Sequence, residues 1–191
     1  NKRYFRDWLL LNKIHHPKTW IFYSKERALK FINVYTDFPL VSKLNIGASG
    51  KGVEIQKNKR QVIQEISQLF GEGKIIKGTP NIGKGSLIKK IKKVFANPAF
   101  IKQRLTEYKQ QSDEVHKNYI ILQEFIKHTF EWRCVVIGDS YFAHKKIIKS
   151  GKTSGSLLKE YENPPLSLLD FIRNLSLNHN IDSAAIDIFE H

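Results

Sequence analysis

The order of the expected strands and helices is the feature that most restricts the fold of this chain. Strand-like segments follow one another across short connections at 39–56 and 119–148, where Gly138-Asp139-Ser140 is a tight-turn signal. Helical periodicity marks 2–12, 24–34, 58–70 and 164–178, with Ser24 and Asn58 as the expected N-caps of the second and third helices. Further strands are expected at 19–23 and 184–190, and loops rich in Gly and Lys at 71–86 and 149–156. Because hairpins outnumber alternating strand-helix-strand units, we predict an α+β fold with two lobes.

Size and composition agree with a chain that folds around a core. Of its 191 residues 41% are hydrophobic, which suffices for one domain or two small lobes. We expect no membrane partner and a cytoplasmic location, because no apolar stretch reaches the roughly 18–20 residues that span a bilayer. The single cysteine, Cys134, excludes an internal disulfide and is expected to be buried. The chain contains no Met and ends in an apparent strand, so we expect a piece of a longer protein.

The positive charge is concentrated in one part of the chain. The formal net charge is +14, and residues 71–118 carry 11 Lys and Arg against 4 Asp and Glu, a net of +7. This segment is predicted to be a basic insert with two amphipathic helices separated by Asn97-Pro98. Such a field attracts polyanions, namely nucleotides, acidic peptides or nucleic acid.

A glycine-rich loop between two predicted strands has two interpretations. It contains Gly47, Gly50 and Gly52, and its backbone N–H groups could cradle phosphate oxygens or simply form a flexible hairpin. The P-loop spacing G-x-x-x-x-G-K-[ST] is not met by GASGKG, by SGKTSGS or by GKGS, which argues against a Walker nucleotidase.

Several polar residues lie in apolar strand patterns, and each could bind a ligand or have a purely structural role. Lys43 ends an apolar strand and either meets a phosphate or extends its ammonium to the surface. Gln123 and Glu124 could line an adenine pocket and Glu131 could bind a ribose diol, or these side chains face water. Asp187, within AAIDIFE, lies at a sheet edge or binds Mg²⁺, an ion that prefers carboxylate oxygens.

Taken together and in this order, these segments resemble the ATP-grasp superfamily. The resemblance is carried by FPLVSKLNIGASGKGVEI, YIILQEFI, EWRCVVIGDSYFAHKK and IDSAAIDIFE, and it is closest to the branch of glutathione synthetase and the ribosomal-protein glutamate ligases. The resemblance implies an ATP- and Mg²⁺-dependent ligase with ATP between two α+β lobes. The γ-phosphate would pass to a substrate carboxylate, and an amine would displace the resulting acyl phosphate to form an amide.

The resemblance also implies a role for each matching residue. Lys43 would bind phosphate and adenine, Glu131 the ribose and Asp187 a Mg²⁺, while Lys2 would touch an ATP phosphate. The loop residues expected to close over the phosphates are Gly47, Ala48, Ser49, Gly50 and Gly52. Those expected to frame the adenine, partly through their backbone, are Gln123, Glu124, Phe125 and Ile126.

Two further cations are candidates for the reaction itself. Arg133 and Lys146 could stabilise the γ-phosphate or the acyl phosphate. Arg133 could equally pair with Glu131, which shares its face of the sheet. His144 could act as an acid or base, but we interpret it as a surface or packed histidine.

The resemblance implies a domain organisation. Residues 1–18 would form a leading helix and linker, and 19–126 an N-terminal lobe containing the insert at 71–118. Residues 127–191 would form an incomplete C-terminal lobe, because the Glu and Asn that complete the family's Mg²⁺ site come from a later strand. We expect this piece not to include the α/β domain that usually precedes the unit, and Ala185 replaces an arginine of some relatives. We therefore expect this piece alone to bind Mg-ATP weakly and to turn over little.

Two other functions stay open. A nucleic-acid-binding protein would use the basic insert, although Trp8, Trp20 and Trp132 are scattered and form no stacking platform. A nucleotide-binding relative without catalysis is the second alternative. In the ligase interpretation, the insert binds an acidic small molecule, peptide or protein, or is a solvated helix face.

Overall fold

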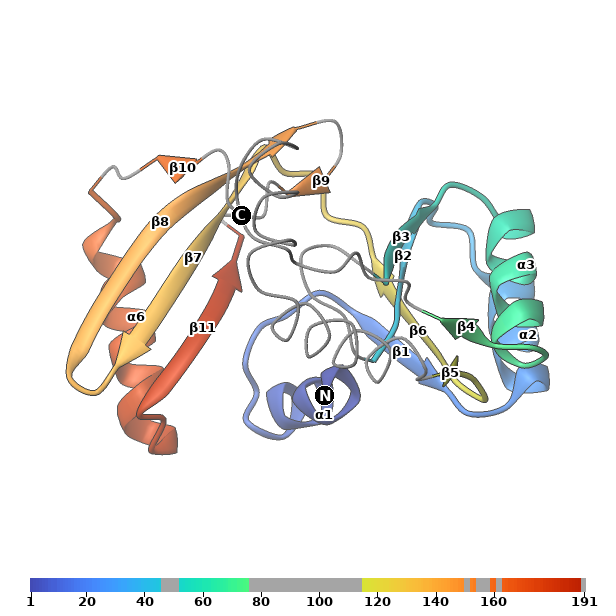
Figure 1. Cartoon of the computed structure of the whole chain (residues 1–191), viewed down its shortest axis with the longest axis horizontal. Helices are drawn as coiled ribbons and strands as arrows, with labels where there is room; N and C mark the ends of the chain where they lie inside the picture. Colours follow the sequence, from blue (N-terminus) through green and yellow to red (C-terminus); the bar gives the residue numbers. More distant parts are fainter. Residues whose placement is uncertain (46–51, 76–114, 150–151, 154–158, 161–162, 190–191) are drawn as a thin grey trace, which may run out of the picture. The chain divides into compact units, whose positions relative to one another are not determined.

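The computed structural model describes residues 1–45, 52–75, 115–149, 152–153, 159–160 and 163–189. They belong to two compact units, Asn1–Phe125 and Ile126–His191, each containing an antiparallel sheet (Figure 1). The predicted α+β class is confirmed, because every strand pair in the described part of the chain is antiparallel. The predicted basic helices near Asn97 lie outside the described residues.

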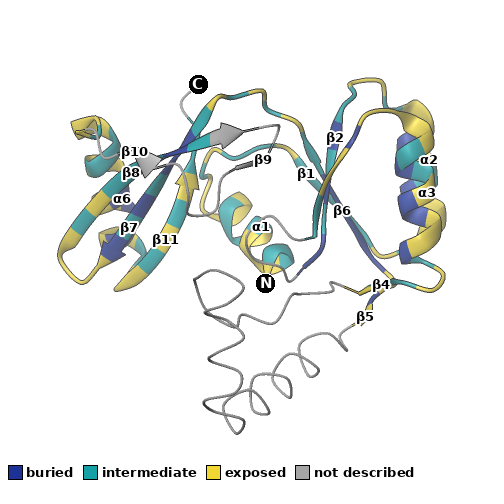
Figure 2. Cartoon of the chain, turned by 45° about the horizontal axis from the view of Figure 1, so that its top comes forward, coloured by how far each residue is buried: buried dark blue, intermediate teal, exposed yellow. Residues whose placement is uncertain are grey.

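The first unit is a four-stranded sheet with two helices on one face. The strand order is β1-β6-β2-β3. The strands are β1 (Thr19–Phe22), β2 (Leu40–Lys43), β3 (Val53–Gln56) and β6 (Ile120–Glu124). The helices are α1 (Lys2–Leu11), α2 (Lys25–Val34) and α3 (Lys59–Leu69). Of these, α2 and α3 cover the sheet face, with their buried residues turned toward it (Figure 2).

The two covering helices begin at the residues that the sequence predicts. The Ser24 Oγ accepts a hydrogen bond from the Arg27 N–H at 3.3 Å, and the Asn58 Oδ1 accepts one from the Gln61 N–H at 3.1 Å. Each cap satisfies an N–H group that has no partner within its helix. Both predicted N-caps are therefore confirmed.

The core of the first unit lies between the helices and the sheet. The completely buried side chains from both helices and from β2 and β6 are Ala28, Ile32, Leu40, Val62, Ile66, Ile120 and Leu122. Because Leu40 and Ser42 face these helices, the strand pleat turns Val41 and Lys43 to the opposite face. Gln123, the cross-strand partner of Val41, shares that second face. The register thus brings two candidate site residues to the sheet face opposite α2 and α3.

A short ribbon begins within the loop that the sequence predicts at 71–86. Strands β4 (Lys74–Ile75) and β5 (Val115–His116) pair antiparallel, with Ile75 opposite Val115. Gly73 precedes the ribbon with φ 84°, and a Cβ there would lie 2.6 Å from a methyl carbon of Val115. Only glycine fits this position, which explains one glycine of the GEG motif.

The Lys74 side chain attaches this ribbon to the rest of the unit. Its ammonium lies 3.0 Å from a Glu54 oxygen and 2.5 Å from the buried Glu65 carboxylate. Burial alone would lower the pKa of Lys74, but the hydrogen bonds to Glu65 and Glu54 raise it. Burial raises the pKa of Glu65, and Lys74 partly opposes that change. Lys74 therefore compensates a carboxylate that would be costly to bury alone.

The second unit is a sheet with one helix. Its strand order is β10-β8-β7-β11, with β9 also paired to β8. The elements are β7 (Phe130–Ile137), β8 (Ser140–Lys149), β9 (Lys152–Thr153), β10 (Lys159–Glu160), α6 (Leu166–His179) and β11 (Ser183–Ile188). The tight turn predicted after β7 is confirmed, because Ile137 pairs with Ser140 and Gly138 has φ 53°.

One loop prediction in this unit is wrong. The sequence suggests a loop at 149–156, but Lys149 continues β8 and pairs with Lys152 of β9. Residues 150–151 and 154–156 of the predicted loop lie outside the described residues.

Helix α6 contacts β7 and β8 and buries alternate residues of the sheet. Trp132, Cys134 and Val136 are each at most 2% exposed. Glu131 and Arg133 alternate with these buried residues along β7 and therefore point to the opposite face of the sheet. In the described part of the chain, no helix has the length and apolar character to cross a membrane.

The Lys74 contacts generate a stability prediction. We expect Lys74→Met to lower the free energy of unfolding of the first unit by about 3 kcal/mol, because Glu65 would remain buried without its cation. Urea unfolding followed by hydrogen exchange of the Leu122 amide measures this. The exposed Lys57→Met is the control, and an equal effect of both changes would contradict the assignment.

Candidate functional site

The face of the first sheet opposite α2 and α3 carries a row of hydrogen-bonded polar side chains. The Lys43 ammonium donates to the Gln123 Oε1 at 2.5 Å, and the Gln123 Nε2 donates to the Thr19 Oγ1 at 2.7 Å. The Thr19 hydroxyl in turn donates to the Pro17 carbonyl at 2.8 Å. The row crosses β2, β6 and β1, so the directions of Lys43 and Gln123 are fixed by their neighbours. Thr19 is a member of this row that the sequence does not single out.

Glu124 and Phe125 continue from this row along the chain. The Glu124 Oε1 accepts from the Lys18 N–H at 2.6 Å, while the Glu124 N–H donates to the Lys18 carbonyl at 2.9 Å. This double contact fixes Glu124 against the segment before β1. The Phe125 side chain is 37% exposed.

Hydrogen bonds hold the two ends of the glycine loop together. The Leu44 N–H donates to the Gly52 carbonyl at 2.7 Å, and Gly52 has φ 71°. The Lys2 ammonium donates to the Leu44 carbonyl at 2.7 Å, and burial lowers the pKa of Lys2. The structure thus brings Lys2 to the start of this loop. The other predicted loop residues, Gly47, Ala48, Ser49 and Gly50, lie outside the described residues.

A buried hydrogen-bond network lies at the start of the same loop, and the sequence does not reveal it. The Asn45 N–H donates to the Tyr119 hydroxyl at 2.9 Å, and that hydroxyl lies 2.9 Å from the His116 Nδ1. All three residues are at most 8% exposed. Their only sequence signal is polarity at isolated positions, which is too common to indicate a contact.

The second unit collects four charged side chains on the face opposite α6. Lys146 of β8 pairs with Glu131 of β7, its direct cross-strand partner. The Lys146 ammonium also lies 3.2 Å from the Asp187 Oδ1, and the Arg133 Nε lies 2.7 Å from the same oxygen. We call these residues, Glu131, Arg133, Lys146 and Asp187, the charged cluster.

Cross-strand register explains which partners form. Asp187 lies directly opposite Arg133, so Arg133 pairs with Asp187, and the alternative pairing with Glu131 considered from the sequence is not the one observed. The Glu131 and Lys146 residues are 7% and 6% exposed, whereas the Arg133 and Asp187 side chains are 32% and 34% exposed. The cluster therefore has a buried pair and an accessible pair that share Lys146.

The described residues contain no group of three His, Cys, Asp or Glu side chains arranged to bind a metal ion. Asp187 is a partly exposed carboxylate and fits Mg²⁺ as one ligand among phosphate and water oxygens, the pattern that Mg²⁺ prefers. His144 lies opposite Arg133 on the same face of the sheet, and it forms interactions of its own.

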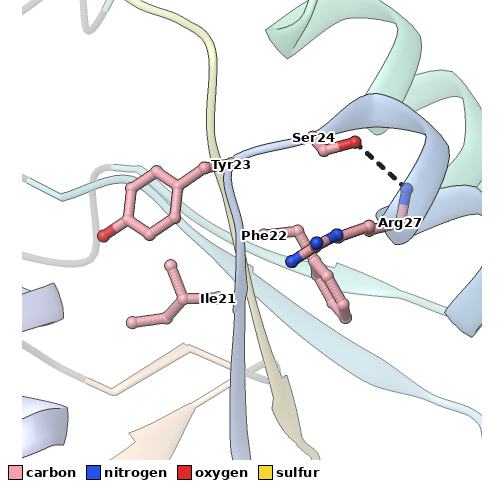
Figure 3. Close-up of a pocket in the computed structure, with 5 residues that line it drawn as sticks. All are labelled: Ile21, Phe22, Tyr23, Ser24 and Arg27. Carbon is pink, nitrogen blue, oxygen red and sulfur yellow. Dashed lines mark hydrogen bonds between the residues drawn. The ribbon is translucent and has the colours of Figure 1, made fainter.

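A shallow hollow of about 350 Å³ lies at the end of β1. Ile21 and Tyr23 line it from one side of the strand, and Phe22 and Arg27 from the other (Figure 3). None of its lining residues is a predicted site residue, and we assign it no function.

Comparisons with known proteins concern the fold. No family model and no curated protein matches the sequence. The chain is similar in structure to a RimK domain ATP-grasp protein from Sphaerobacter thermophilus, with 14% identity over 100% of this chain and 53% of that one and a TM-score of 0.53. It is also similar to the phosphoribosylamine–glycine ligase of Thermotoga maritima, with 14% identity over 96% of this chain and 41% of that one and a TM-score of 0.57.

A third similar structure is the RiPP-associated ATP-grasp ligase of Chryseobacterium gregarium, solved with ADP and a leader and core peptide. It shows 16% identity over 96% of this chain and 46% of that one, with a TM-score of 0.53. This chain has the ATP-grasp fold. The predicted resemblance in fold is therefore confirmed, and the chain spans about half the length of these solved structures.

The cysteine next to the charged cluster gives a testable property of this chain. Burial raises the pKa of the Cys134 thiol to about 12, with Asp187 adding to the rise and Arg133 opposing it. Because only the thiolate reacts, we expect alkylation at pH 8 to be on the order of a thousandfold slower than for a free cysteine. Iodoacetamide labelling followed by mass spectrometry measures the rate. Labelling in urea is the control, and rapid labelling of the folded chain would contradict the described burial.

Proposed function

We propose that this chain forms part of an ATP-dependent ligase that joins a carboxylate to an amine through an acyl phosphate. The observation that carries the proposal is the charged cluster on the sheet face opposite α6, in a chain with the ATP-grasp fold. A neutral arrangement of two carboxylates and two cations can bind both a metal-bound polyphosphate and the hydroxyl groups of a nucleotide. The proposed enzyme acts in the cytoplasm.

In the first unit, the polar row supports nucleotide binding. Lys43 is fixed by Gln123, so its ammonium is oriented before a ligand arrives. Such preorganisation lowers the entropy cost of binding a phosphate. We assign phosphate binding to Lys2, Lys43 and the glycine loop. We assign adenine binding to Gln123, Glu124 and Phe125, and to Ile126, the first residue of the second unit.

In the second unit, we assign a different role to each part of the charged cluster. Arg133 and Lys146 stabilise negative charge on the transferring phosphoryl group, because their cations are held in place by acidic neighbours. Glu131 accepts hydrogen bonds from the ribose hydroxyls. Asp187 provides an oxygen for Mg²⁺, which when bound neutralises phosphate charge.

The substrate class follows from charge. A net charge of +14 favours an acidic small molecule, peptide or protein as the carboxylate substrate. The similar Chryseobacterium enzyme was solved with a leader and core peptide, which supports a peptide. A nucleic-acid partner would instead show a steep loss of affinity for generic DNA or RNA with added salt.

The role of Asp187 predicts a change in the metal dependence of ATP binding. We expect Asp187→Asn to weaken Mg-ATP binding about tenfold, because a carboxylate ligand is lost. Without Mg²⁺, the same variant should bind free ATP at least as well as the original chain, because a like charge near the phosphates is removed. Calorimetric titration with and without Mg²⁺ measures both affinities.

The matched control for this variant is Asp139→Asn, in the exposed turn after β7. It should leave both affinities unchanged, because Asp139 is not part of the charged cluster. An equal loss of Mg-ATP and free-ATP affinity in Asp187→Asn would contradict a metal-binding role. Absence of ATP binding by the full-length protein that contains this chain would contradict the proposed function itself.

The ribbon predicts how the basic insert can be separated from ATP binding. Because Ile75 and Val115 face each other, an Asn-Gly turn can replace 76–114 and close the β4–β5 hairpin. We expect this deletion to change ATP affinity by less than about twofold. The affinity for an acidic peptide should fall about tenfold, because the peptide loses its cationic partner.

Charge reversal at Lys89, Lys90, Lys92 and Lys93 is the matched variant that keeps the chain length. It should weaken binding of the acidic peptide and leave ATP affinity unchanged. Fluorescence anisotropy of a labelled acidic peptide measures the first quantity, and calorimetry measures the second. Equal losses of both ligands would show that the insert only supports the ATP-binding lobe.

A further inference from the structure

We propose that Tyr119 is a positioning residue for the glycine loop, and that His116 of the β4–β5 ribbon holds Tyr119 in place. This inference rests on the proposed function, because it concerns the loop to which phosphate binding is assigned. Neither residue is a predicted site residue. Tyr119 lies between β5 and β6, so it connects the ribbon to the sheet that carries the loop (Figure 1).

Asn45, the last described residue before the glycines of the loop, is held through three polar groups. Its N–H donates to the Tyr119 hydroxyl at 2.9 Å, and its Oδ1 accepts from the Arg3 N–H at 3.4 Å. Its carbonyl oxygen accepts from the Lys2 N–H at 3.5 Å. The contact to Tyr119 is the shortest of the three, and both of its partners are buried. Loss of this contact would leave a buried N–H unpaired, which makes it the most costly of the three to remove.

The Tyr119 hydroxyl is held from its other side by His116. The oxygen lies 2.9 Å from the His116 Nδ1, and it either donates to this nitrogen or accepts from it. In both arrangements a lone pair of the hydroxyl accepts the Asn45 N–H, so the contact does not depend on the charge or tautomer of the imidazole. Tyr119 and His116 are at most 6% exposed, and their rings meet edge to face. Water therefore competes little for the hydroxyl.

The ring of Tyr119 is held as well, and it has a natural comparison nearby. The Arg3 guanidinium lies over the Tyr119 ring, 4.6 Å from its centre. The same guanidinium lies 5.6 Å from the ring centre of Tyr23, which is exposed. Both tyrosines thus contact Arg3 through their rings, whereas it is the Tyr119 hydroxyl that meets Asn45. Tyr23 is therefore a matched control for removal of a hydroxyl.

A weaker contact links the ribbon to the other end of the loop. Glu54 lies in β3, which begins directly after Gly52, and its carboxylate is 3.0 Å from the Lys74 ammonium. The Glu54 side chain is 55% exposed, and exposed ion pairs contribute little to stability. The buried contact through Tyr119 should therefore dominate the hold of the ribbon on the loop.

A fixed Asn45 favours phosphate binding for a physical reason. Backbone N–H groups bind phosphate oxygens when they point into one concavity, and this requires the chain to be ordered. Fixing the ends of a loop lowers the conformational entropy that the chain between them loses on binding a ligand. Loss of the Tyr119 hydroxyl should therefore weaken contacts to the phosphates of a nucleotide and leave those to its base and sugar.

The first test is hydrogen exchange followed at single amides in the full-length protein that contains this chain. We expect the Asn45 amide to exchange about tenfold faster in Tyr119→Phe, which keeps the ring and removes the acceptor of this N–H. The Leu122 amide, on β6 between β1 and β2, should change by less than about twofold. Tyr23→Phe should leave both amides unchanged. An equal acceleration of both amides in Tyr119→Phe would show a general loss of stability and overturn the inference.

Substitutions of His116 test whether it acts through Tyr119. His116→Phe keeps a ring without a nitrogen, and it should accelerate exchange of the Asn45 amide about threefold, because the hydroxyl loses its second partner. His116→Asn, with a polar group near the Nδ1 position, should restore most of the protection. Combining His116→Phe with Tyr119→Phe should add nothing to Tyr119→Phe alone. Effects that multiply in the double variant would contradict the role of His116.

The second test concerns the proposed ligand and uses calorimetric titration of the same full-length protein with Mg-ATP and with AMP. We expect Tyr119→Phe to weaken binding of Mg-ATP about fivefold and binding of AMP, which has no β- or γ-phosphate, by less than about twofold. Tyr23→Phe should change neither affinity. Equal losses of both nucleotides in Tyr119→Phe would overturn the inference. If the exchange results hold but ATP does not bind, the proposed function is wrong and the contact between Tyr119 and the loop stands.

Discussion

The alternation of side chains along each strand is the constraint on which the described arrangement depends. In both units, helices cover one face of an antiparallel sheet, and this fixes where every second residue must go. Leu40 and Leu122 face the helices of the first unit, which sends Lys43 and Gln123 to the other side. A shift of register by one residue would bury the Lys43 charge in the core. Hydrophobic burial and presentation of the polar row therefore have a single cause.

The two faces solve the problem of buried charge in different ways. The first unit uses a directional chain of neutral hydrogen-bond partners, from Lys43 through Gln123 and Thr19 to a backbone carbonyl. The second uses ion pairs, with the buried Glu131 and Lys146 next to a more exposed Arg133 and Asp187. Buried ion pairs add little net stability, but they hold side chains in defined orientations. That property is useful where a ligand's polar groups must be met in a fixed geometry.

Sequence patterns predict the elements with strong local signals and miss those that depend on distant contacts. The caps at Ser24 and Asn58 and the turn at Gly138 follow from local chemistry, and all are present. The two-residue strands β4 and β9 are too short for any periodicity and exist only because a partner strand lies beside them. For the same reason the loop predicted at 149–156 is wrong.

In the candidate site, too, local signals are predicted from the sequence and contacts between distant residues are not. Polar residues within apolar strands point to Lys43, Glu131 and Asp187 as unusual positions, but the partner of Arg133 depends on register, which a single sequence does not fix. Thr19 carries no signal of its own, because threonine is common in strands. Only the fold shows that Thr19 contacts Gln123.

Lys146 is shared by two carboxylates, and this has a thermodynamic consequence. Its ammonium contacts both Glu131 and Asp187, so a change in the charge of one acid alters how strongly the lysine is drawn to the other. Two ligands that each engage one of these acids must then influence each other's affinity by the same factor, whichever arrives first. A sugar and a metal ion bound to this sheet would be energetically linked without any movement of the backbone.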